Sequence, residues 1–368
     1  MNVLYVVSTL KRCGPTNQLF GLVKNLDRSR FTPFVLTLSP ETGESRWDDF
    51  VALGINVQSL GLGRLSGLLK GRKALSARLS AIKPVLVHSQ GIRADSLCVQ
   101  VLPRSVVQVA TLRNYPFKDY VMSFGRIQGE LMAHWHLFNL RRVNAVALVS
   151  NAIHGMLQGR LPQARVVQNG VDVDRYHLAD NAERALLRER LELPQGARIF
   201  ISTGHLDPRK DPITAINGFL GGAREGDQLL VLGDGVLREE LQSRYGSSNQ
   251  VKFLGRVANV QEYLQASDYF ISASLAEGLP NAVLEALACG LPCLLSDIAE
   301  HSEILLGSNL RSLLFSTGSN EALAECLRGL DDSNYAQARA EAVAIISSGF
   351  SAAHMSAHYQ ALYKELLS

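Results

Sequence analysis

Short apolar runs rich in valine, isoleucine and leucine recur along the chain, and longer segments with helical spacing of apolar residues separate them. This alternation is typical of parallel sheets built from strand–helix–strand units. The runs predict strands at residues 3–7, 34–38, 85–88, 106–110 and 145–149 in the first half, and at 199–203, 228–232, 251–254, 269–272 and 293–296 in the second. Both halves are therefore expected to be doubly wound α/β folds.

The length of the chain also favours two domains, because 368 residues exceed what one hydrophobic core usually supports. A turn signal at residues 169–172, Asn-Gly-Val-Asp, follows a short strand expected at Val166-Val167 and separates the two halves. We predict a first domain over residues 1–168 and a second over residues 169–349. Residues 350–368 predict a terminal helix, because Ala353, Ala357, Leu362 and Leu366 recur at near-helical spacing.

Composition indicates a folded, enzyme-sized protein, since 19% of the residues are charged, 46% are hydrophobic and no low-complexity tract is present. The net charge of +3 hides an asymmetry. Residues 1–165 carry 21 Lys or Arg and 8 Asp or Glu, which gives +13, and the remaining residues carry 16 and 26, which gives −10. The first half should therefore face an anionic partner: a membrane surface, a phosphorylated substrate or nucleic acid. Nucleic acid is the weakest of these, since no binding motif accompanies the charge.

No segment of the sequence is expected to cross a bilayer. The longest stretch without a charged residue, 342–363, is interrupted by serine, glycine, histidine and glutamine. Residues 2–8 predict a buried strand and not a signal peptide, because a basic leader and a small-residue cleavage site are missing. We expect a cytoplasmic protein.

The five cysteines indicate neither a disulfide scaffold nor a metal site. Cys289 and Cys293 form the only close pair, and no second Cys or His pair stands at zinc-like spacing. We expect small buried hydrophobic side chains in a reducing compartment, and no bound metal.

The densest set of candidate functional residues lies within 272–290, where a strand, a glycine-rich bend and a helix follow in order. Pro280 and Gly290 occupy positions that helix ends prefer, so Glu277 should lie on the loop and Glu285 on the helix. First-turn amides can bind an anion or polyol oxygens, and each flanking carboxylate can accept hydrogen bonds from the vicinal hydroxyls of a sugar or a ribose. In the alternative interpretation, Glu285 lies on a solvated helix face and Glu277 caps a neighbouring turn.

The sequence around these carboxylates closely resembles the retaining glycosyltransferases of family 4. The resemblance is carried by Glu277-x7-Glu285 within Glu-Gly-Leu-Pro-Asn, then by Leu-Glu-Ala-Leu-Ala-Cys-Gly-Leu-Pro and Ser296-Asp297. Segments that resemble other motifs of the family, in its order, are 169–172, 203–211, 231–235 and 253–255. The resemblance implies a GT-B fold, in which two Rossmann-like doubly wound domains face each other across a cleft. It also implies that the terminal helix, 350–368, crosses back to the first, acceptor-side domain.

The resemblance assigns roles in the second domain. Glu285 is expected to bind the ribose diol. Glu277 is expected to bind the transferred sugar, together with the backbone of a donor-binding turn formed by Gly278, Leu279, Pro280 and Asn281.

Arg209 and Lys210 have a physical reason to bind the diphosphate, because the leaving nucleoside diphosphate gathers negative charge and no metal site is evident. His205 stands where the family has an arginine, and it would add to the diphosphate site when protonated. No cofactor is expected besides the nucleotide sugar as co-substrate. A dinucleotide site is disfavoured, because Gly233-Asp234-Gly235 would need its third glycine at Arg238.

Four candidates for the sugar or the acceptor lie in the first domain. Gly14 follows Cys13 where the family often has two glycines, and it can line the cleft. His88, at a strand end, is either a cleft residue or a buried, satisfied histidine. Arg113 and Asn114 fall where many relatives place a sugar-contacting histidine. Arg113 would either pair an anionic group of the donor or acceptor, or lie exposed in an acceptor loop.

A basic amphipathic helix is expected at residues 64–83, with either a packed apolar face and solvated basic residues or a contact with anionic lipid headgroups. Its basic residues are Arg64, Lys70, Arg72, Lys73, Arg78 and Lys83. Core packing or an apolar acceptor surface would explain the aromatic residues Tyr115, Phe117, Tyr120, Phe124, Trp135 and Phe138.

The function implied by the resemblance is metal-independent, retaining transfer of a sugar from a nucleotide diphosphate sugar to a lipid-linked or saccharide acceptor, in cell-surface polysaccharide or glycolipid synthesis. The protein would be cytoplasmic, with possible peripheral contact at the inner face of the membrane. One alternative is a nucleotide-sugar 2-epimerase of the same fold, which would isomerise the sugar without an acceptor. The other is a non-catalytic scaffold that binds sugar nucleotides, which would show no turnover.

Overall fold

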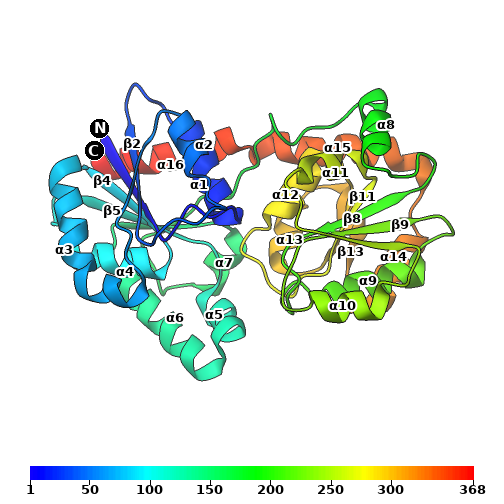
Figure 1. Ribbon diagram of the computed structural model, residues 1–368, viewed down its shortest axis with the longest axis horizontal. Coiled ribbons are helices and arrows are strands. Elements are labelled where there is room, and N and C mark those ends of the chain that lie inside the picture. The colour runs from blue at the N-terminus through cyan, green and yellow to red at the C-terminus, as the bar shows by residue number, and fades with distance from the viewer. The chain divides into compact units, whose positions relative to one another are not determined.

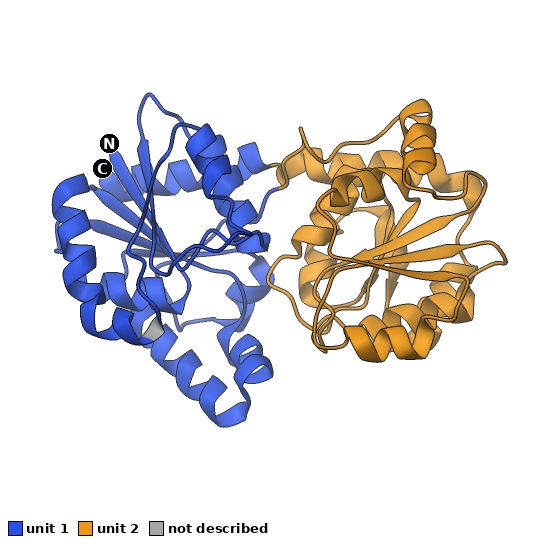
Figure 2. Ribbon diagram, viewed as in Figure 1, with its two compact units in different colours: residues 1–170, 352–368 blue, residues 171–351 orange. Residues whose placement is uncertain are grey.

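A computed structural model describes residues 1–63 and 65–368; the side chain of Arg64, one of the basic residues of the predicted amphipathic helix, lies outside the described residues. The chain divides into two compact units, shown in Figure 2. Unit 1 comprises Met1–Gly170 and Ala352–Ser368, and unit 2 comprises Val171–Ser351. The chain therefore passes from one unit to the other within the turn at residues 169–172.

Unit 1 is built on a seven-stranded parallel sheet with the strand order β3-β2-β1-β4-β5-β6-β7 (Figure 1). The order reverses between β1 and β4, so the sheet is doubly wound with a switch point between these strands. The strands are β1 (Asn2–Val7), β2 (Thr32–Thr37), β3 (Asn56–Ser59), β4 (Leu86–Gln90), β5 (Val107–Leu112), β6 (Ala145–Leu148) and β7 (Ala164–Val166).

Helices cover both faces of this sheet, because side chains of successive strand residues point to opposite faces. Val3 and Tyr5 pack in the cluster that contains the apolar residues of α1, and Leu4 and Val6 pack in the cluster that contains those of α3 and α4. The helices between the strands are α1 (Gly14–Lys24), α2 (Trp47–Ala52), α3 (Arg64–Ile82), α4 (Ile92–Val101), α5 (Pro116–Phe124), α6 (Arg126–Leu140) and α7 (Asn151–Met156).

The last helix, α16 (Ala352–Leu367), completes unit 1. Met355, Tyr359 and Tyr363 of this helix are buried in the cluster with α1 and β1. Its first residue packs against Gly21 of α1, where an added Cβ would lie 3.2 Å from the Cβ of Ala352. The predicted terminal helix is therefore present, and the chain returns to the first unit as the resemblance implies.

Unit 2 repeats the doubly wound design with a six-stranded sheet of order β10-β9-β8-β11-β12-β13, whose switch point lies between β8 and β11. Helices α9 and α14 pack together over one cluster with the strands, and α12 packs on α15. The strands are β8 (Ile199–Thr203), β9 (Gln228–Leu232), β10 (Val251–Gly255), β11 (Tyr269–Ser272), β12 (Cys293–Ser296) and β13 (Leu314–Phe315). The helices are α8 (Asn181–Arg190), α9 (Pro212–Gly222), α10 (Arg238–Tyr245), α11 (Val260–Ala266), α12 (Asn281–Ala288), α13 (Ala299–Ile304), α14 (Asn320–Arg328) and α15 (Tyr335–Gly349).

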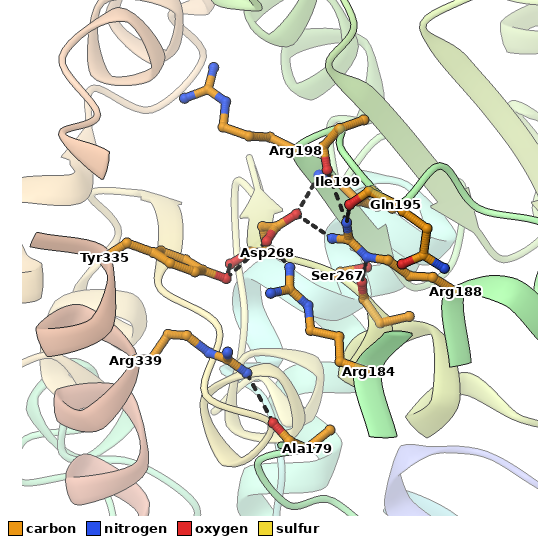
Figure 3. A network of polar contacts seen from close by, with 12 residues as sticks. Ala179, Arg184, Arg188, Gln195, Arg198, Ile199, Ser267, Asp268, Tyr335 and Arg339 are labelled. Carbon is orange, nitrogen blue, oxygen red and sulfur yellow. Dashed lines mark hydrogen bonds and ion pairs between the residues drawn. The ribbon is translucent and has the colours of Figure 1, made fainter. Parts of the chain in front are cut away.

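A buried polar network fastens the amino ends of the central strands of unit 2 (Figure 3). The carboxylate of Asp268, just before β11, accepts hydrogen bonds from the backbone of Ile199 (2.7 Å) and from Arg188 of α8 (2.7 Å). Arg184 of α8 and the hydroxyl of Tyr335 at the start of α15 also bond to it. The network therefore ties two helices to β8 and β11 at the edge of the sheet opposite to their carboxyl ends.

Within residues 1–63 and 65–368, no helix has both the length and the apolar composition needed to cross a membrane.

Candidate active site

The loops that follow β8 and β11 lie at the switch point of unit 2, where doubly wound sheets bind their ligands. Residues 204–211 follow β8 and contain Arg209 and Lys210, and residues 273–280 follow β11 and contain Glu277. The backbone of Leu275 donates a hydrogen bond to the carbonyl of Arg209 at 2.8 Å, which holds the two loops together.

Two glycines let the loop after β9 run against the loop after β8. A Cβ on Gly233 would lie 1.8 Å from the carbonyl oxygen of Gly204, and a Cβ on Gly235 would lie 2.4 Å from that of Leu206. The φ of Gly233 is +139°, a conformation that side chains disfavour. The Gly-Asp-Gly segment therefore allows the backbones of the two loops to lie in close contact beside the candidate site.

Glu277 forms an ion cluster with the two predicted diphosphate-binding cations. One carboxylate oxygen lies 3.1 Å from Nη1 of Arg209, and the other lies 2.5 Å from Nζ of Lys210. Arg209 also donates to the carbonyl of Ala276 at 3.0 Å. The carboxylate side chain is 6% exposed, whereas the side chains of Arg209 and Lys210 are 22% and 20% exposed. The cations are therefore the outer members of the cluster.

The charge state of Glu277 follows from this arrangement. Burial raises its pKa, but the charges of Lys210 and Arg209 and the hydrogen bond from Lys210 outweigh burial and lower the pKa to about 2. Glu277 is therefore ionised at neutral pH. A carboxylate with so low a pKa, bound to two cations, is a weak base and a weak nucleophile.

Glu285 lies on α12 in a different electrostatic environment. Burial raises its pKa to about 7, although the charges of Arg175 and Lys210 and a hydrogen bond with Tyr176 oppose the rise. Lys210 thus acts on both carboxylates of the motif and most strongly on Glu277. The alternative interpretation, in which Glu285 lies on a solvated helix face and Glu277 caps a turn, does not describe these surroundings.

The turn between the two carboxylates leads directly into α12. Gly278, Leu279 and Pro280 are buried, Pro280 is the N-cap residue, and the helix begins at Asn281. Proline has no side-chain acceptor for the first-turn amides, and the first turn holds no acidic residue. The amino end of α12 is therefore compatible with a bound anion or polyol oxygen.

His205 lies exposed on the loop after β8. No described residue holds its ring by a hydrogen bond or an ion pair. Its predicted contribution to diphosphate binding stays a prediction.

Three residues that surround the candidate site belong to none of the motifs recognised in the sequence. Arg175 and Tyr176 act on Glu285, and His301 of α13 acts electrostatically on Glu277. His301 is fully buried, its Nδ1 lies 2.9 Å from the carbonyl of Ser296, and burial lowers its pKa to about 4. Their place in the sequence could have indicated them: Arg175 and Tyr176 follow the 169–172 turn, and His301 follows the Ser296-Asp297 pair.

No group of three or more His, Cys, Asp or Glu side chains is placed to hold a metal ion in the part of the chain that the structure describes. The five cysteines are free thiols, three of them buried.

In unit 1, Gly14 is the first residue of α1, after the loop that follows β1 at the other switch point. Cys13 is the N-cap residue and makes no side-chain cap. Gly14 is partly exposed, so it remains a candidate for lining a ligand site.

The candidate role of His88 as a cleft residue is not supported. His88 is fully buried, its Nδ1 lies 2.6 Å from the hydroxyl of Tyr363 and its Nε2 lies 2.7 Å from the hydroxyl of Thr111. Burial and the charge of Arg113 lower its pKa to about 3. The alternative, a buried and satisfied histidine, describes it, because both ring nitrogens already have partners.

Arg113 is half-buried and not the exposed loop arginine of the second alternative. Its guanidinium donates to three neutral acceptors: the side chain of Gln90 at 2.8 Å, and the Pro15 carbonyl and the Asn169 side chain at 3.4 Å each. Burial lowers its pKa, and no carboxylate pairs it among the described residues. Asn114 instead donates to Asp119 of α5 at 3.2 Å.

Two family models match successive parts of the chain. Residues 14–175 match a model described as Glycosyltransferase Family 4, and residues 197–332 match one described as Glycosyl transferases group 1. Together they cover most of both units.

The chain is also similar in sequence to glycosyltransferases of Escherichia coli. It is 26% identical to the O-antigen biosynthesis glycosyltransferase WclY of Escherichia coli over 318 residues, which are 83% of this chain and 82% of that protein. Over 142 residues, 36% of each chain, it is 34% identical to an Escherichia coli UDP-Gal:alpha-D-GlcNAc-diphosphoundecaprenol alpha-1,3-galactosyltransferase.

Solved structures share the fold. HepE of Anabaena in complex with UDP and glucose gives a TM-score of 0.81 at 19% identity and covers 99% of both chains. Sucrose-phosphate synthase of Thermosynechococcus elongatus gives a TM-score of 0.85 at 18% identity, over 100% of this chain and 99% of that one. With two Rossmann-like units, the paired-glutamate motif at the switch point of the second and both family models in order, the chain is a glycosyltransferase of the GT-B fold, whose first part matches Glycosyltransferase Family 4 and whose second part matches Glycosyl transferases group 1.

Proposed function

We propose that this glycosyltransferase moves a sugar, with retention of anomeric configuration, from a nucleotide diphosphate sugar to a hydroxyl of a lipid-linked or saccharide acceptor. Two relatives support this choice by their activities, O-antigen biosynthesis in one and transfer to a diphosphoundecaprenol-linked sugar in the other. Solved structures of the HepE fold neighbour hold UDP-glucose. The product would be a cell-surface polysaccharide or glycolipid.

The observation that carries the proposal is the cluster of Glu277 with Arg209 and Lys210. Two cations against one carboxylate leave a net charge of +1 at the switch point of unit 2. Because the cations are the outer members, an incoming diphosphate meets them first. The carboxylate behind them keeps both cations positioned before the substrate arrives.

Each side chain then has a role set by its charge. Arg209 and Lys210 stabilise the negative charge that develops on the diphosphate as its bond to the sugar breaks. Glu277 and the 278–281 turn bind hydroxyls of the transferred sugar, and Glu285 binds the ribose diol. His205 adds to the diphosphate site when protonated.

We assign no protein nucleophile, because the low pKa and the two ion pairs of Glu277 make it a weak one. The acceptor hydroxyl instead gives its proton to an oxygen of the departing diphosphate, on the face that the diphosphate leaves. One sugar–oxygen bond breaks and one forms on the same face, which retains the configuration. Nuclear magnetic resonance of the first product formed distinguishes retention from inversion.

We further propose that transfer needs no metal and no cofactor besides the donor, because two side-chain cations supply the charge that a metal would supply. Unchanged initial rates after chelation of divalent cations would agree with this. A rate that falls on chelation and returns with Mg²⁺ or Mn²⁺ would contradict it.

The experiment that tests the donor class is thermal stabilisation against UDP-, GDP-, ADP- and TDP-sugars. A ligand at 100 times its dissociation constant adds about 2.7 kcal/mol of stability. One nucleotide should stabilise the protein selectively, and transfer should follow when an acceptor is added. Isomerised sugar without acceptor, or stabilisation without turnover over a broad acceptor panel, would instead favour an epimerase or a scaffold.

Two substitutions test the residues of the cluster. Glu277→Gln should lower kcat by roughly 10²-fold or more, because it removes the charge that positions both cations. Lys210→Ala should weaken binding of the nucleoside diphosphate much more than binding of the nucleoside. Full turnover in a folded Glu277→Gln variant would refute the assignment of Glu277, and equal losses for nucleoside and diphosphate would refute that of Lys210.

A further inference from the structure

Helix α6 carries apolar residues on two opposite faces. Gly129, Ala133 and Leu140 belong to the buried face, as expected for a helix that covers a sheet. The opposite face exposes an apolar stripe at helical spacing, in which every side chain is at least half exposed. This outward stripe consists of Ile127 (80%), Leu131 (67%), Trp135 (51%) and Phe138 (53%). Contiguous exposed apolar surface of this kind marks an interaction site.

The helix that carries the outward stripe is held firmly in place. Gly129 lets α5 and α6 pack backbone to backbone, since a Cβ there would lie 2.5 Å from the carbonyl oxygen of Tyr120. His136 of α6 bonds through Nε2 to the carboxylate of Asp95 on α4 and through Nδ1 to the hydroxyl of Tyr120, both at 2.8 Å. The stripe is therefore a fixed feature of unit 1 and not an unpacked segment.

Other exposed apolar side chains extend the same part of unit 1. Met122 and Phe124 of α5 are 42% and 46% exposed. In Figure 1 the pair α5 and α6 forms one end of unit 1, and α4 packs between α6 and α3. Three leucines near the amino end of α3 are each about four-fifths exposed: Leu65 (80%), Leu68 (79%) and Leu69 (86%). Helices α3 and α6 both lead into parallel strands, so their amino ends lie at the carboxyl edge of the sheet.

The charge of this region identifies the partner. No acidic residue lies between Asp49 and Asp95, and seven basic ones do: Arg64, Lys70, Arg72, Lys73, Arg78, Lys83 and Arg93. Exposed Arg141 and Arg142 follow α6, and the guanidinium of Arg142 lies 5.9 Å from the ring centre of Phe138. One exposed carboxylate, Glu130, lies beside the stripe, and it pairs with Arg126 of the same helix at 3.5 Å. Apolar side chains next to predominantly positive charge fit the interface of a bilayer with anionic headgroups.

We infer that the outward stripe of α6, with the exposed leucines of α3, docks unit 1 on an anionic membrane surface, where Trp135 and its neighbours enter the boundary between headgroups and acyl chains. The reason for such docking rests on the proposed function, because a lipid-linked acceptor would be presented at a bilayer. The surface also refines the predicted basic helix: the first turns of α3 offer apolar side chains to the membrane, whereas Leu75, Leu79 and Ile82 are buried against the sheet.

The test is flotation of the full chain with vesicles of phosphatidylcholine plus phosphatidylglycerol and with vesicles of phosphatidylcholine alone. The intact protein should float with the anionic vesicles and hardly with the neutral ones. Leu131→Glu combined with Trp135→Glu should weaken flotation at least roughly tenfold, the change that a loss of about 1.4 kcal/mol produces. The matched control is Leu186→Glu combined with Leu306→Glu in unit 2, which adds the same two negative charges at exposed leucines (67% and 76%) outside the stripe.

A second measurement reads the stripe itself. The chain has two tryptophans, Trp47 and Trp135, so Trp47→Phe leaves Trp135 as the single reporter. Its emission should shift to shorter wavelength when anionic vesicles are added, as the ring leaves water.

Three results would overturn the inference: equal flotation of the stripe variant and the control, a Trp135 emission that vesicles do not change, or a wild-type dimer that the stripe variant disperses while neither protein floats. The last result would make a second copy of the chain the occupant. Thermal stabilisation by the nucleotide sugar, measured on the same variants, keeps the two proposals apart. Donor binding without flotation would contradict only the docking surface. Flotation without donor binding would contradict only the proposed function.

Discussion

Two carboxylates eight positions apart have pKa values that their surroundings shift in opposite directions. Glu277 has two cations within hydrogen-bond distance, and its pKa falls to about 2 despite burial. No cation among the described residues forms an ion pair with Glu285, so burial outweighs the charges of Arg175 and Lys210 and raises its pKa to about 7. At neutral pH the first is therefore fully ionised and the second is divided between its two forms.

The two shifts predict opposite effects of pH on stability. Glu277 has a folded pKa below its ordinary value of 4.5, so its stabilising contribution is complete above that value and is lost as the pH falls toward 2. Glu285 has a raised folded pKa, so folding is favoured at or below pH 4.5 and is progressively opposed as the pH rises through about 7. A difference of one pKa unit between the folded and the unfolded state corresponds to roughly 1.4 kcal/mol in the free energy of unfolding.

Glu285→Gln should therefore flatten the pH dependence of stability in the window between about 4.5 and 7. The variant should gain stability relative to the wild type at the upper end of this window and little at the lower end. Urea unfolding of both proteins at several pH values measures this. A difference between the proteins that stays constant across the window would contradict the raised pKa.

Residue types and spacing indicated Glu277, Arg209 and Lys210 as candidates, because each lies in a short sequence motif on a loop that follows a strand, and the structure brings the three together. The surroundings of Glu285 could not be predicted in the same way. Tyr176 and Arg175 reach it from more than a hundred positions away in the chain, and only packing brings them together. His88 shows the same limit, since its partner Tyr363 is supplied by the last helix.

At the scale of elements, the ten predicted strands are all confirmed within one or two residues of their ends. Parallel strands covered on both faces are continuously apolar, which makes them conspicuous in a sequence. The strands that were not predicted are those without this signal. β3 (Asn56–Ser59) is a partly exposed edge strand with two polar amides, and β13 has only two residues, Leu314–Phe315. The three-residue strand β7 (Ala164–Val166) shares only Val166 with the short strand expected at Val166-Val167.

Gly233 should not tolerate a side chain. Gly233→Ala places a Cβ 1.8 Å from the carbonyl oxygen of Gly204 at a φ of +139°, so one of the two loops beside the ion cluster must move. We expect a loss of about 3 kcal/mol or more, with weakened donor binding. Gly196→Ala is the control, because nothing lies within 4 Å of its Cβ and its φ is not positive. Similar unfolding midpoints for the two variants would count against the close approach.

Asp268 should matter for stability but not for the site. Asp268→Asn leaves Arg184 and Arg188 without their carboxylate at the edge of the sheet opposite to the ion cluster (Figure 3). We expect a loss of roughly 3–5 kcal/mol, as for other broken buried ion pairs, with an unchanged dissociation constant for the donor while the protein is folded. Asp332→Asn, which breaks more exposed pairs, is the control. Stability loss no larger than in the control would refute a structural role for the network.

At the scale of the whole molecule, the chain is two doubly wound units with separate cores, and the last helix belongs to the first of them. Length, the turn at 169–172 and the opposite charges of the two halves all pointed to two domains. The return of the chain to unit 1 could not be deduced from periodicity, since the apolar spacing of a helix does not indicate which core the helix packs against. Only the resemblance to family 4 supplied that expectation.

Tyr363 tests how much unit 1 depends on that helix. Its side chain is fully buried and bonds to His88, so Tyr363→Ala opens a cavity and leaves a buried ring nitrogen unpaired. We expect a loss of about 3–5 kcal/mol in the unfolding of unit 1, measured by denaturant titration. Lys364→Ala, at the exposed neighbouring position, should have little effect. Equal effects of the two changes would show that the helix adds little to this core.

The return of α16 to unit 1 also determines the order in which the two units can complete their folding during synthesis. Residues 1–170 emerge before unit 2, yet the surface of α1 that receives Met355, Tyr359 and Tyr363 stays uncovered until residues 352–368 have also emerged. Unit 2, whose residues are contiguous, can reach its native state while the nascent chain is still attached. The half of the protein that is translated first is therefore the half that matures last.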